Sequence, residues 1–313
     1  MIKSIGIVGL ISLAGLESTA MAGDTAVSGR IYASYSFDLS EGAEYANEFD
    51  IDRAYINVKS KISERLSARI TTDVGRLSDG EADAKVRPYL KYAYLEVKDV
   101  APGVKVRVGM AGLGLIATHE NFWGHRWIEK SFTDRNKLHS SSDIGLHAIG
   151  AHGQFSWQGG LVNGSGYGKA EDDASKKAQL QVGYDLLKSD DSAPIYLFVS
   201  HEVGAEAPVT LVAAAGGYSS KVVTVWAEGV TEMEGDRMGL GYSVSLVPHM
   251  GKNNLVLRYD DWDVDTAVDE DNARYALAGV SHDFAKKLSA GITYKHRLDE
   301  ADHGIHLQTR VGF

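Results

Sequence analysis

Short runs in which apolar and polar residues alternate strictly are the feature that most constrains the fold of this chain. The clearest run is the last, Ile305–Phe313, where the odd-numbered residues are apolar except for one threonine and the even-numbered ones are polar, charged or glycine. A period of two places these sets on opposite faces of a β-strand. A last strand with one apolar and one charged face fits a closed membrane barrel, which faces lipid outside and water inside. The alternative is an amphipathic edge strand of a soluble β-sandwich.

The same alternation recurs in sixteen runs. They span residues 26–37, 49–59, 66–74, 89–98, 104–110, 143–150, 154–162, 178–186, 194–201, 210–217, 221–230, 237–246, 255–259, 274–282, 288–296 and 305–313. Gly216, Gly217 and a nearby alanine run make the tenth and eleventh less regular. We therefore predict an all-β, antiparallel transmembrane barrel of 16 strands, with 14 as the alternative.

The connections between these runs alternate in length. The odd-numbered ones are long and polar, whereas even-numbered ones such as Ser63–Glu64, Asp99–Gly103 and Ala151–Gly153 are short. Outer-membrane barrels have short periplasmic turns and longer external loops, so both chain ends are expected on the periplasmic side. Sixteen strands would enclose an aqueous lumen, whereas eight would be filled by side chains.

The amino-terminal segment Met1–Ala22 has the features of a secretory signal peptide. Lys3 is basic, Ile5–Leu16 is mainly apolar, and Ala20–Ala22 has the A-x-A form of a cleavage site. Residues 23–313 then form a single barrel domain. They contain no apolar run of about 18 residues, the length that a membrane-spanning helix needs. The chain has no cysteine, which suits an exported protein whose closed β-ladder needs no disulfides. The net charge of −10 argues against a nucleic-acid partner.

The longest connection, Ala111–Ser141, is the main candidate for function. It is too long for a hairpin turn and too aromatic for a disordered linker. We predict that it is the third external loop and folds into the lumen, where its charges select ions by sign. The alternative is a solvated loop whose aromatic residues pack on the rim. The expected constriction residues are Glu120, His125, Arg126, Glu129, Lys130, Asp134, Arg135 and Lys137.

The inward-facing positions of the first five strands are strongly basic. With one residue of the last strand, the expected pore wall comprises Arg30, Arg53, Arg69, Asp73, Lys105, Arg107 and Arg310. Such a wall favours anions, although some of these arginines could simply pair with carboxylates. Charges at the narrowest point should dominate, because salt screens more distant charges within about 8–10 Å.

Other chemistry has weaker support. The acidic stretch Asp260–Asp265 lacks the glycine and terminal glutamate of an EF-hand, and the histidines match no metal-site spacing, so we expect neither a metal nor a cofactor. No G-x-S-x-G motif is present, so we do not expect an enzyme. An outer-membrane hydrolase and a structural or adhesin barrel serving a partner protein remain the alternatives to a channel.

Several segments resemble the phosphate-selective porin O/P type of bacterial porin. They are Phe49–Lys59, Leu66–Arg76, Leu90–Leu95, Trp123–Arg126 with Lys130, Ser142–Gly145 and Asn163–Tyr167. The resemblance implies a 16-stranded, usually trimeric barrel with an inward-folded third loop. Gly112–Ile116 departs from the family, which often has lysine and proline there.

The carboxy-terminal strand, with Phe313 as its last residue, resembles the strand by which bacterial outer-membrane barrels are recognised for assembly. Together these features predict a porin in the bacterial outer membrane for ions and small hydrophilic solutes. Its expected partners are outer-membrane lipid, lipopolysaccharide, the barrel-assembly machinery and two further copies of the chain.

Overall fold

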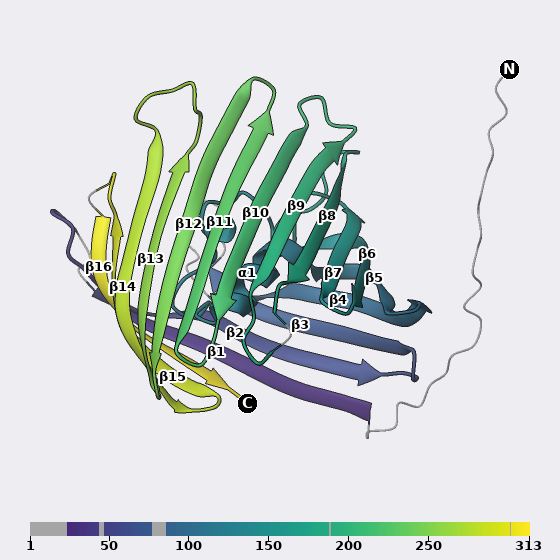
Figure 1. Ribbon diagram of the computed structural model, residues 1–313, viewed down its shortest axis with the longest axis horizontal. Coiled ribbons are helices and arrows are strands. Elements are labelled where there is room, and N and C mark those ends of the chain that lie inside the picture. Colours follow the sequence, from purple (N-terminus) through teal and green to yellow (C-terminus); the bar gives the residue numbers. More distant parts are fainter. Residues whose placement is uncertain (1–23, 44–46, 77–85, 188, 301) are drawn as a thin grey trace, which may run out of the picture.

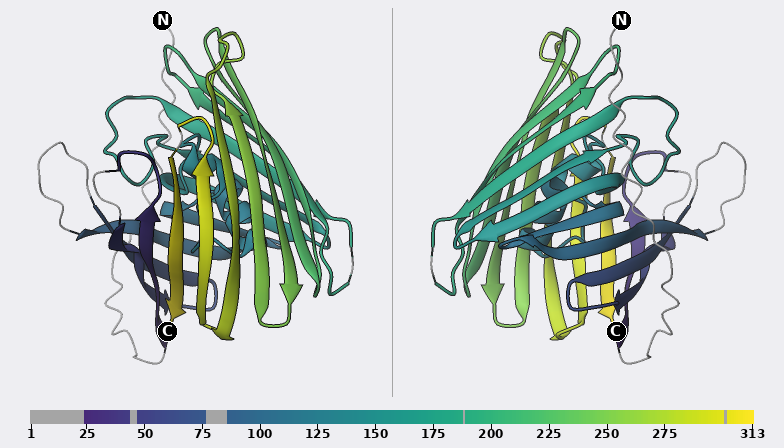
Figure 2. Two further views of the ribbon diagram at one scale, coloured as in Figure 1. Left: turned by 90° about the vertical axis from the view of Figure 1, so that its left-hand side faces the viewer. Right: turned by 90° about the vertical axis from the view of Figure 1, so that its right-hand side faces the viewer.

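The computed structural model describes residues 24–43, 47–76, 86–187, 189–300 and 302–313, and the expected signal peptide lies outside these residues. Sixteen antiparallel strands form a closed barrel in which each strand pairs with its neighbours in sequence and β1 pairs with β16 (Figure 1). Every predicted run corresponds to one strand, so 16 is confirmed over 14. Figure 2 shows from two sides how the strand direction changes around the ring.

The strands and helices have the following bounds. They are β1 (Thr25–Asp38), β2 (Asn47–Lys61), β3 (Leu66–Arg76), β4 (Val86–Ala101), β5 (Val104–Gly112), α1 (Gly114–Trp123), α2 (Phe132–Arg135), β6 (Ser142–His152), β7 (Phe155–Val162), β8 (Lys176–Asp185), β9 (Pro194–Val203), β10 (Val209–Ser219), β11 (Val223–Glu234), β12 (Arg237–Met250), β13 (Asn253–Asp263), β14 (Asn272–Ala285), β15 (Leu288–Arg297) and β16 (Asp302–Gly312). Neither helix is long and apolar enough to cross a membrane.

The outward face of the wall is apolar. In β12, Leu240, Tyr242 and Val244 are exposed, whereas Ser243 and Ser245 between and beside them are buried. The last strand behaves in the same way, with Leu307 exposed and Gln308 buried. An apolar surface that extends around a closed barrel is typical of a protein surrounded by lipid.

The last strand closes the barrel against the first. Ile31 pairs with Val311, and the backbone groups of Gly29 and Phe313 exchange hydrogen bonds of 3.0 and 3.1 Å. A Cβ atom on Gly29 would lie 1.9 Å from the Phe313 ring, so a larger residue here would force that ring to move. The predicted closure is confirmed, and Phe313 lies at the rim where the short turns are found.

Two connections depart from the predicted alternation. The eleventh is a two-residue turn, Gly235–Asp236, because β11 and β12 extend beyond the predicted runs. The eighth, between β8 and β9, is longer than the other turns at the short-turn rim.

Two β-bulges change which side chains point inward. The β1–β2 register shifts at Asp52, so Phe49 and Ile51 are exposed on the outward face together with Ile56. The β3–β4 register shifts at Lys91, so both Lys91 and Tyr92 lie on the inward side. A bulge reverses the inward and outward parity of a strand beyond it.

Candidate functional site

The segment 113–141, between β5 and β6, is held by buried apolar residues. Trp123, Trp127 and Ile128 pack with Tyr32 of β1 and with β12–β14. Leu115 and Phe132 pack in a second cluster with residues of β9, β10, β11 and β13. The segment therefore contacts strands on widely separated parts of the ring, and Figure 1 shows α1 behind the front strands.

A glycine ends α1. Gly124 adopts the left-handed conformation at φ 74°, and its N–H donates to the carbonyl of Glu120. At the start of the helix, a Cβ on Gly114 would lie 2.8 Å from Oε1 of Gln181, so that side chain would have to shift. Gly124 therefore sets where the chain turns after the helix.

The helix is anchored to β11 by a buried pair. Nδ1 of His119 lies 2.8 Å from Oε1 of Glu228, and both side chains are almost fully buried. The His119 ring stacks on Trp226 with 5.4 Å between ring centroids. Glu228 was missing from the sequence prediction, although a lone carboxylate at an inward position of an apolar strand was a usable signal.

The part of the segment after α1 is anchored to β13–β16. Lys295 and Gln308 donate to the carbonyl oxygen of Ile128 at 2.7 and 2.8 Å. Glu129 pairs with Lys295 at 3.1 Å and accepts from the Tyr275 hydroxyl at 2.8 Å. Burial opposes the ionisation of Glu129, but the positive charges of Lys295 and Arg258 outweigh it and hold the pKa of that carboxyl well below its usual range.

A second anchor involves the acidic stretch Asp260–Asp265, where the sequence predicts no metal site. Arg258 forms a buried salt bridge with Asp260 at 2.7 Å and donates to the carbonyl of Lys130. Arg135 also reaches Asp260, at 3.4 Å, and lies over the Tyr275 ring. Asp260 therefore belongs to β13 and balances arginines. Within the described residues no group of three or more acidic or histidine side chains is arranged to hold a metal ion.

The eight expected constriction residues separate into three sets. Glu120, Arg126 and Asp134 form a network, with Nε of Arg126 2.5 Å from Glu120 and Nη2 3.5 Å from Asp134. His125, Glu129 and Arg135 instead contact the strands. Lys130 and Lys137 are exposed.

Three of the expected wall arginines of β1–β5 lie over tyrosine rings. Arg53 lies over Tyr55 at 4.3 Å, Arg69 over Tyr92 at 4.5 Å and Arg107 over Tyr94 at 4.8 Å; Arg30 donates to the Tyr32 hydroxyl. Arg53 pairs with Asp73 at 3.2 Å, and Lys105 and Arg107 both pair with Glu96. Arg310 lies apart from this group, near Asp283 and over Trp127.

Lys91 is a second residue that the sequence prediction missed. Its ammonium donates to Ser141 at 2.6 Å and lies 3.2 Å from the centre of the Tyr167 ring. Strict alternation back from Leu95 would place Lys91 on the lipid-facing side and Leu90 inside, and this mismatch was a usable signal for the bulge. Among the basic side chains of the wall and the segment, Arg30, Arg69, Lys91, Lys130 and Lys137 have no described carboxylate within 4.0 Å.

Two serine–histidine pairs lie within 3.5 Å among the described residues. Oγ of Ser36 lies 3.0 Å from Nδ1 of His306, and both side chains are half-buried. Oγ of Ser281 lies 3.5 Å from Nε2 of His125, but both of these side chains are buried and lack substrate access. A serine nucleophile needs a histidine base held by a carboxylate or amide, together with access for substrate.

No protein-family model matches the chain, and no curated protein matches it either. The chain does match solved structures. OmpF of Salmonella typhi in complex with daunomycin has a TM-score of 0.66 and 12% identity, covering 93% of this chain and 98% of that one. OmpT of Vibrio cholerae in a trimer form has a TM-score of 0.64 and 13% identity, covering 92% and 99%. An anion-selective porin from Comamonas acidovorans has a TM-score of 0.63 and 14% identity, covering 92% and 99%.

These identities are low, so the likeness concerns the fold. The phosphate-selective type inferred from short segments stays a prediction. The chain has a porin-like fold, a closed antiparallel barrel of 16 strands.

Proposed function

We propose that the protein is an outer-membrane porin through which ions and small hydrophilic solutes diffuse passively. The apolar outer wall supports this location, as do neighbours of the same fold that are described as outer-membrane proteins or porins. In this proposal the segment 113–141 lies in the lumen and narrows it, and the protein is not an enzyme.

One observation carries the proposal: charged and polar side chains of the segment lie against those of the wall. The Lys91 side chain of β4 donates to Ser141, and Glu129 pairs with Lys295 of β15. Charged side chains that face a water-filled passage orient and select passing ions.

The finer part of the proposal is a preference for anions. Several basic side chains of the wall and the segment have no described carboxylate within 4.0 Å, whereas Asp73, Glu96, Glu120 and Asp134 all contact arginine. Local excess positive charge should outweigh the distant acidic loops, since salt screens charges beyond about 8–10 Å. The trimer form of one neighbour and the anion selectivity of another support a trimeric, anion-preferring channel.

Single-channel recording in a planar bilayer tests the proposal. Purified folded protein should give stepwise conductance, and a salt gradient should give a reversal potential of the sign that anion flow predicts. Folded protein without steps would refute the channel. Turnover of an ester or lipid that is lost in Ser36→Ala would instead favour the hydrolase alternative.

A further inference from the structure

The outward wall contains a pit of about 640 Å³ in β8–β12, close to the short-turn rim. Its floor consists of small residues on β10 and β11: Ala214 opposite Gly229, and Gly216 opposite Ala227. Residues two apart on a strand share a face, and cross-strand partners lie side by side. These four residues therefore form one continuous patch without large side chains.

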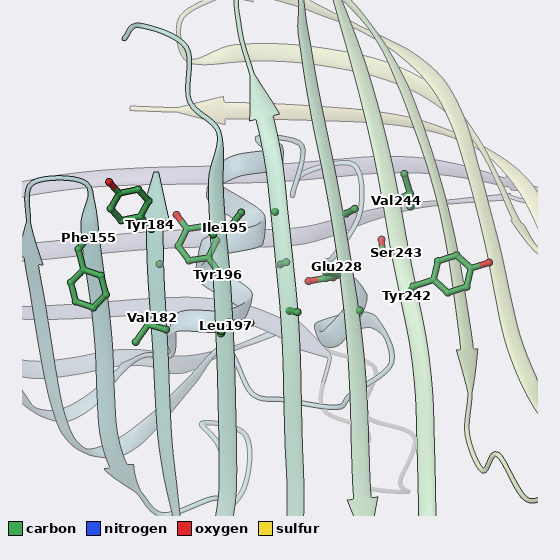
Figure 3. Close-up of a pocket in the computed structure, with 16 residues that line it drawn as sticks. Phe155, Val182, Tyr184, Ile195, Tyr196, Leu197, Glu228, Tyr242, Ser243 and Val244 are labelled. Carbon is green, nitrogen blue, oxygen red and sulfur yellow. The ribbon is translucent and has the colours of Figure 1, made fainter. Parts of the chain in front are cut away.

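Large side chains surround this floor. In Figure 3, Tyr184, Ile195 and Leu197 stand on one side and Tyr242 and Val244 on the other. Their Cβ atoms point outward, as their exposure shows. The pit is thus a local gap in a surface that otherwise presents large apolar groups to hydrocarbon. A surface gap left unfilled forfeits dispersion contacts, so a chain that fits it gains them.

A second hollow continues from the pit toward the rim. Tyr218 lies two residues beyond Gly216 on the same face of β10, and its hydroxyl donates to Asp191 at 3.0 Å. The hollow is lined by Tyr218, Asp190, Asp191 and Lys221. Lys221 is exposed, and among the described residues no carboxylate lies within 4.0 Å of its ammonium. A cation and two carboxylates therefore lie together at the rim, just below an apolar pit.

We propose that the pit and the hollow form a binding site for one phospholipid with a zwitterionic aminoalkyl-phosphate headgroup. The acyl chains lie on the floor of β10 and β11, the phosphate binds Lys221 and the ammonium binds Asp190. Opposite charges at the rim match the two charges of such a headgroup, and an anionic headgroup would meet the carboxylates unfavourably. This site is independent of conduction through the lumen.

A second copy of the chain fits the pit less well. The outer wall of a barrel is convex, so another barrel would contact the large residues at the edges and leave the floor uncovered. A phospholipid has the flexible, narrow chains that reach such a floor, and it brings a headgroup to the level of the rim.

Native mass spectrometry of the purified full chain in detergent tests the site, with phosphatidylethanolamine and phosphatidylglycerol added at equal concentration. The wild type should retain one phosphatidylethanolamine per chain and at least about tenfold less phosphatidylglycerol. Ala214→Leu and Ala227→Leu fill the floor and should each reduce retention at least about tenfold. Ala278→Leu, on the outward face of β14 away from the pit, is the matched control and should retain lipid.

The headgroup is tested separately. Asp190→Asn leaves the pit intact and removes the partner of the ammonium, so it should abolish the preference between the two lipids. This variant also tests the site if the floor variants fail to fold. Equal retention in the floor variants and the wild type would overturn the acyl-chain site. Unchanged preference in Asp190→Asn would overturn the headgroup assignment. If Ala227→Leu loses its oligomeric state but retains as much lipid as the wild type, the pit is a contact between copies of the chain.

Discussion

At the residue scale, similar charges in the segment 113–141 have different roles. Arg126 and Arg135 are both held by carboxylates, whereas Lys130 and Lys137 extend into solvent without one. A paired charge contributes little net field, so the exposed lysines should contribute more to ion selectivity than their paired neighbours do.

Replacing Lys130 by glutamate should therefore shift the reversal potential toward cations, because it changes the local charge by two units in the narrow part. The measurement is the bilayer reversal potential under a salt gradient. Lys252→Glu, in the turn between β12 and β13, is the control and should shift it far less. Equal shifts in both variants would place Lys130 outside the narrow part.

His139 predicts a dependence on pH. Burial, with a smaller effect from Lys177, lowers the pKa of its imidazole to about 3. An unfolded histidine has a pKa of about 6.5. Between these two pKa values, His139 binds a proton when the segment is detached from the strands but not when it is docked. Docking should therefore be most stable above about pH 6.5 and weaken as the pH falls toward about 3.

Hydrogen exchange of the segment 113–141 measured from pH 7.5 to 4.5 checks this expectation. After correction for the intrinsic pH dependence of exchange, the free energy of protection in the wild type should fall by up to about 1.4 kcal/mol for each unit by which the pH is lowered. His139→Phe keeps an aromatic ring beside Phe198 and removes the titration, so its corrected exchange should change less. The same slope in both proteins would exclude His139 as the cause.

At the element scale, α1 depends on β11. The His119–Glu228 pair and the Trp226 stack join a helix to a strand more than a hundred residues away. Removing one partner of a buried pair leaves the other without its hydrogen bond and costs about 3–5 kcal/mol when the pair is ionised.

Glu228→Ala should therefore loosen α1 while the barrel remains closed. We expect faster proteolysis within the segment and noisier conductance. The unheated protein should still migrate on a gel as a folded barrel. Glu206→Ala, an exposed carboxylate in the loop between β9 and β10, should change neither property. If Glu228→Ala is cut at the same rate as the wild type, the apolar clusters alone hold the helix.

At the scale of the whole molecule, closure depends on the contact between β1 and β16. Gly29 gives space to the Phe313 ring, and the backbones of these two residues are joined by hydrogen bonds in both directions. An open sheet in a membrane would leave a row of unpaired backbone groups in hydrocarbon, which costs several kcal/mol per group.

Gly29→Leu should consequently reduce the yield of folded barrel much more than Ala278→Leu, which adds the same side chain to an open part of the wall. The measurement is the fraction of heat-modifiable, folded protein after refolding into vesicles. Equal yields would mean that the Phe313 ring can move aside without loss of closure.

The sequence by itself determined the strand number, the inward and outward faces over most of the wall, and the closing strand Ile305–Phe313. These follow from a period-two pattern in which each side chain reports its own face, so no distant contact is needed. The pattern could also locate the segment 113–141, because its length and aromatic content are local properties.

Only the tertiary structure decided the bulges and the charge pairing. One bulge turns Phe49 and Ile51 outward and another turns Lys91 inward, against strict alternation. Whether Lys130 is exposed while Arg135 meets Asp260, or whether His119 finds Glu228, depends on distances between residues far apart in the chain. Alternation records which side of the wall a residue occupies. An electrostatic interaction depends instead on the separation of two charges, which is fixed only by the tertiary structure.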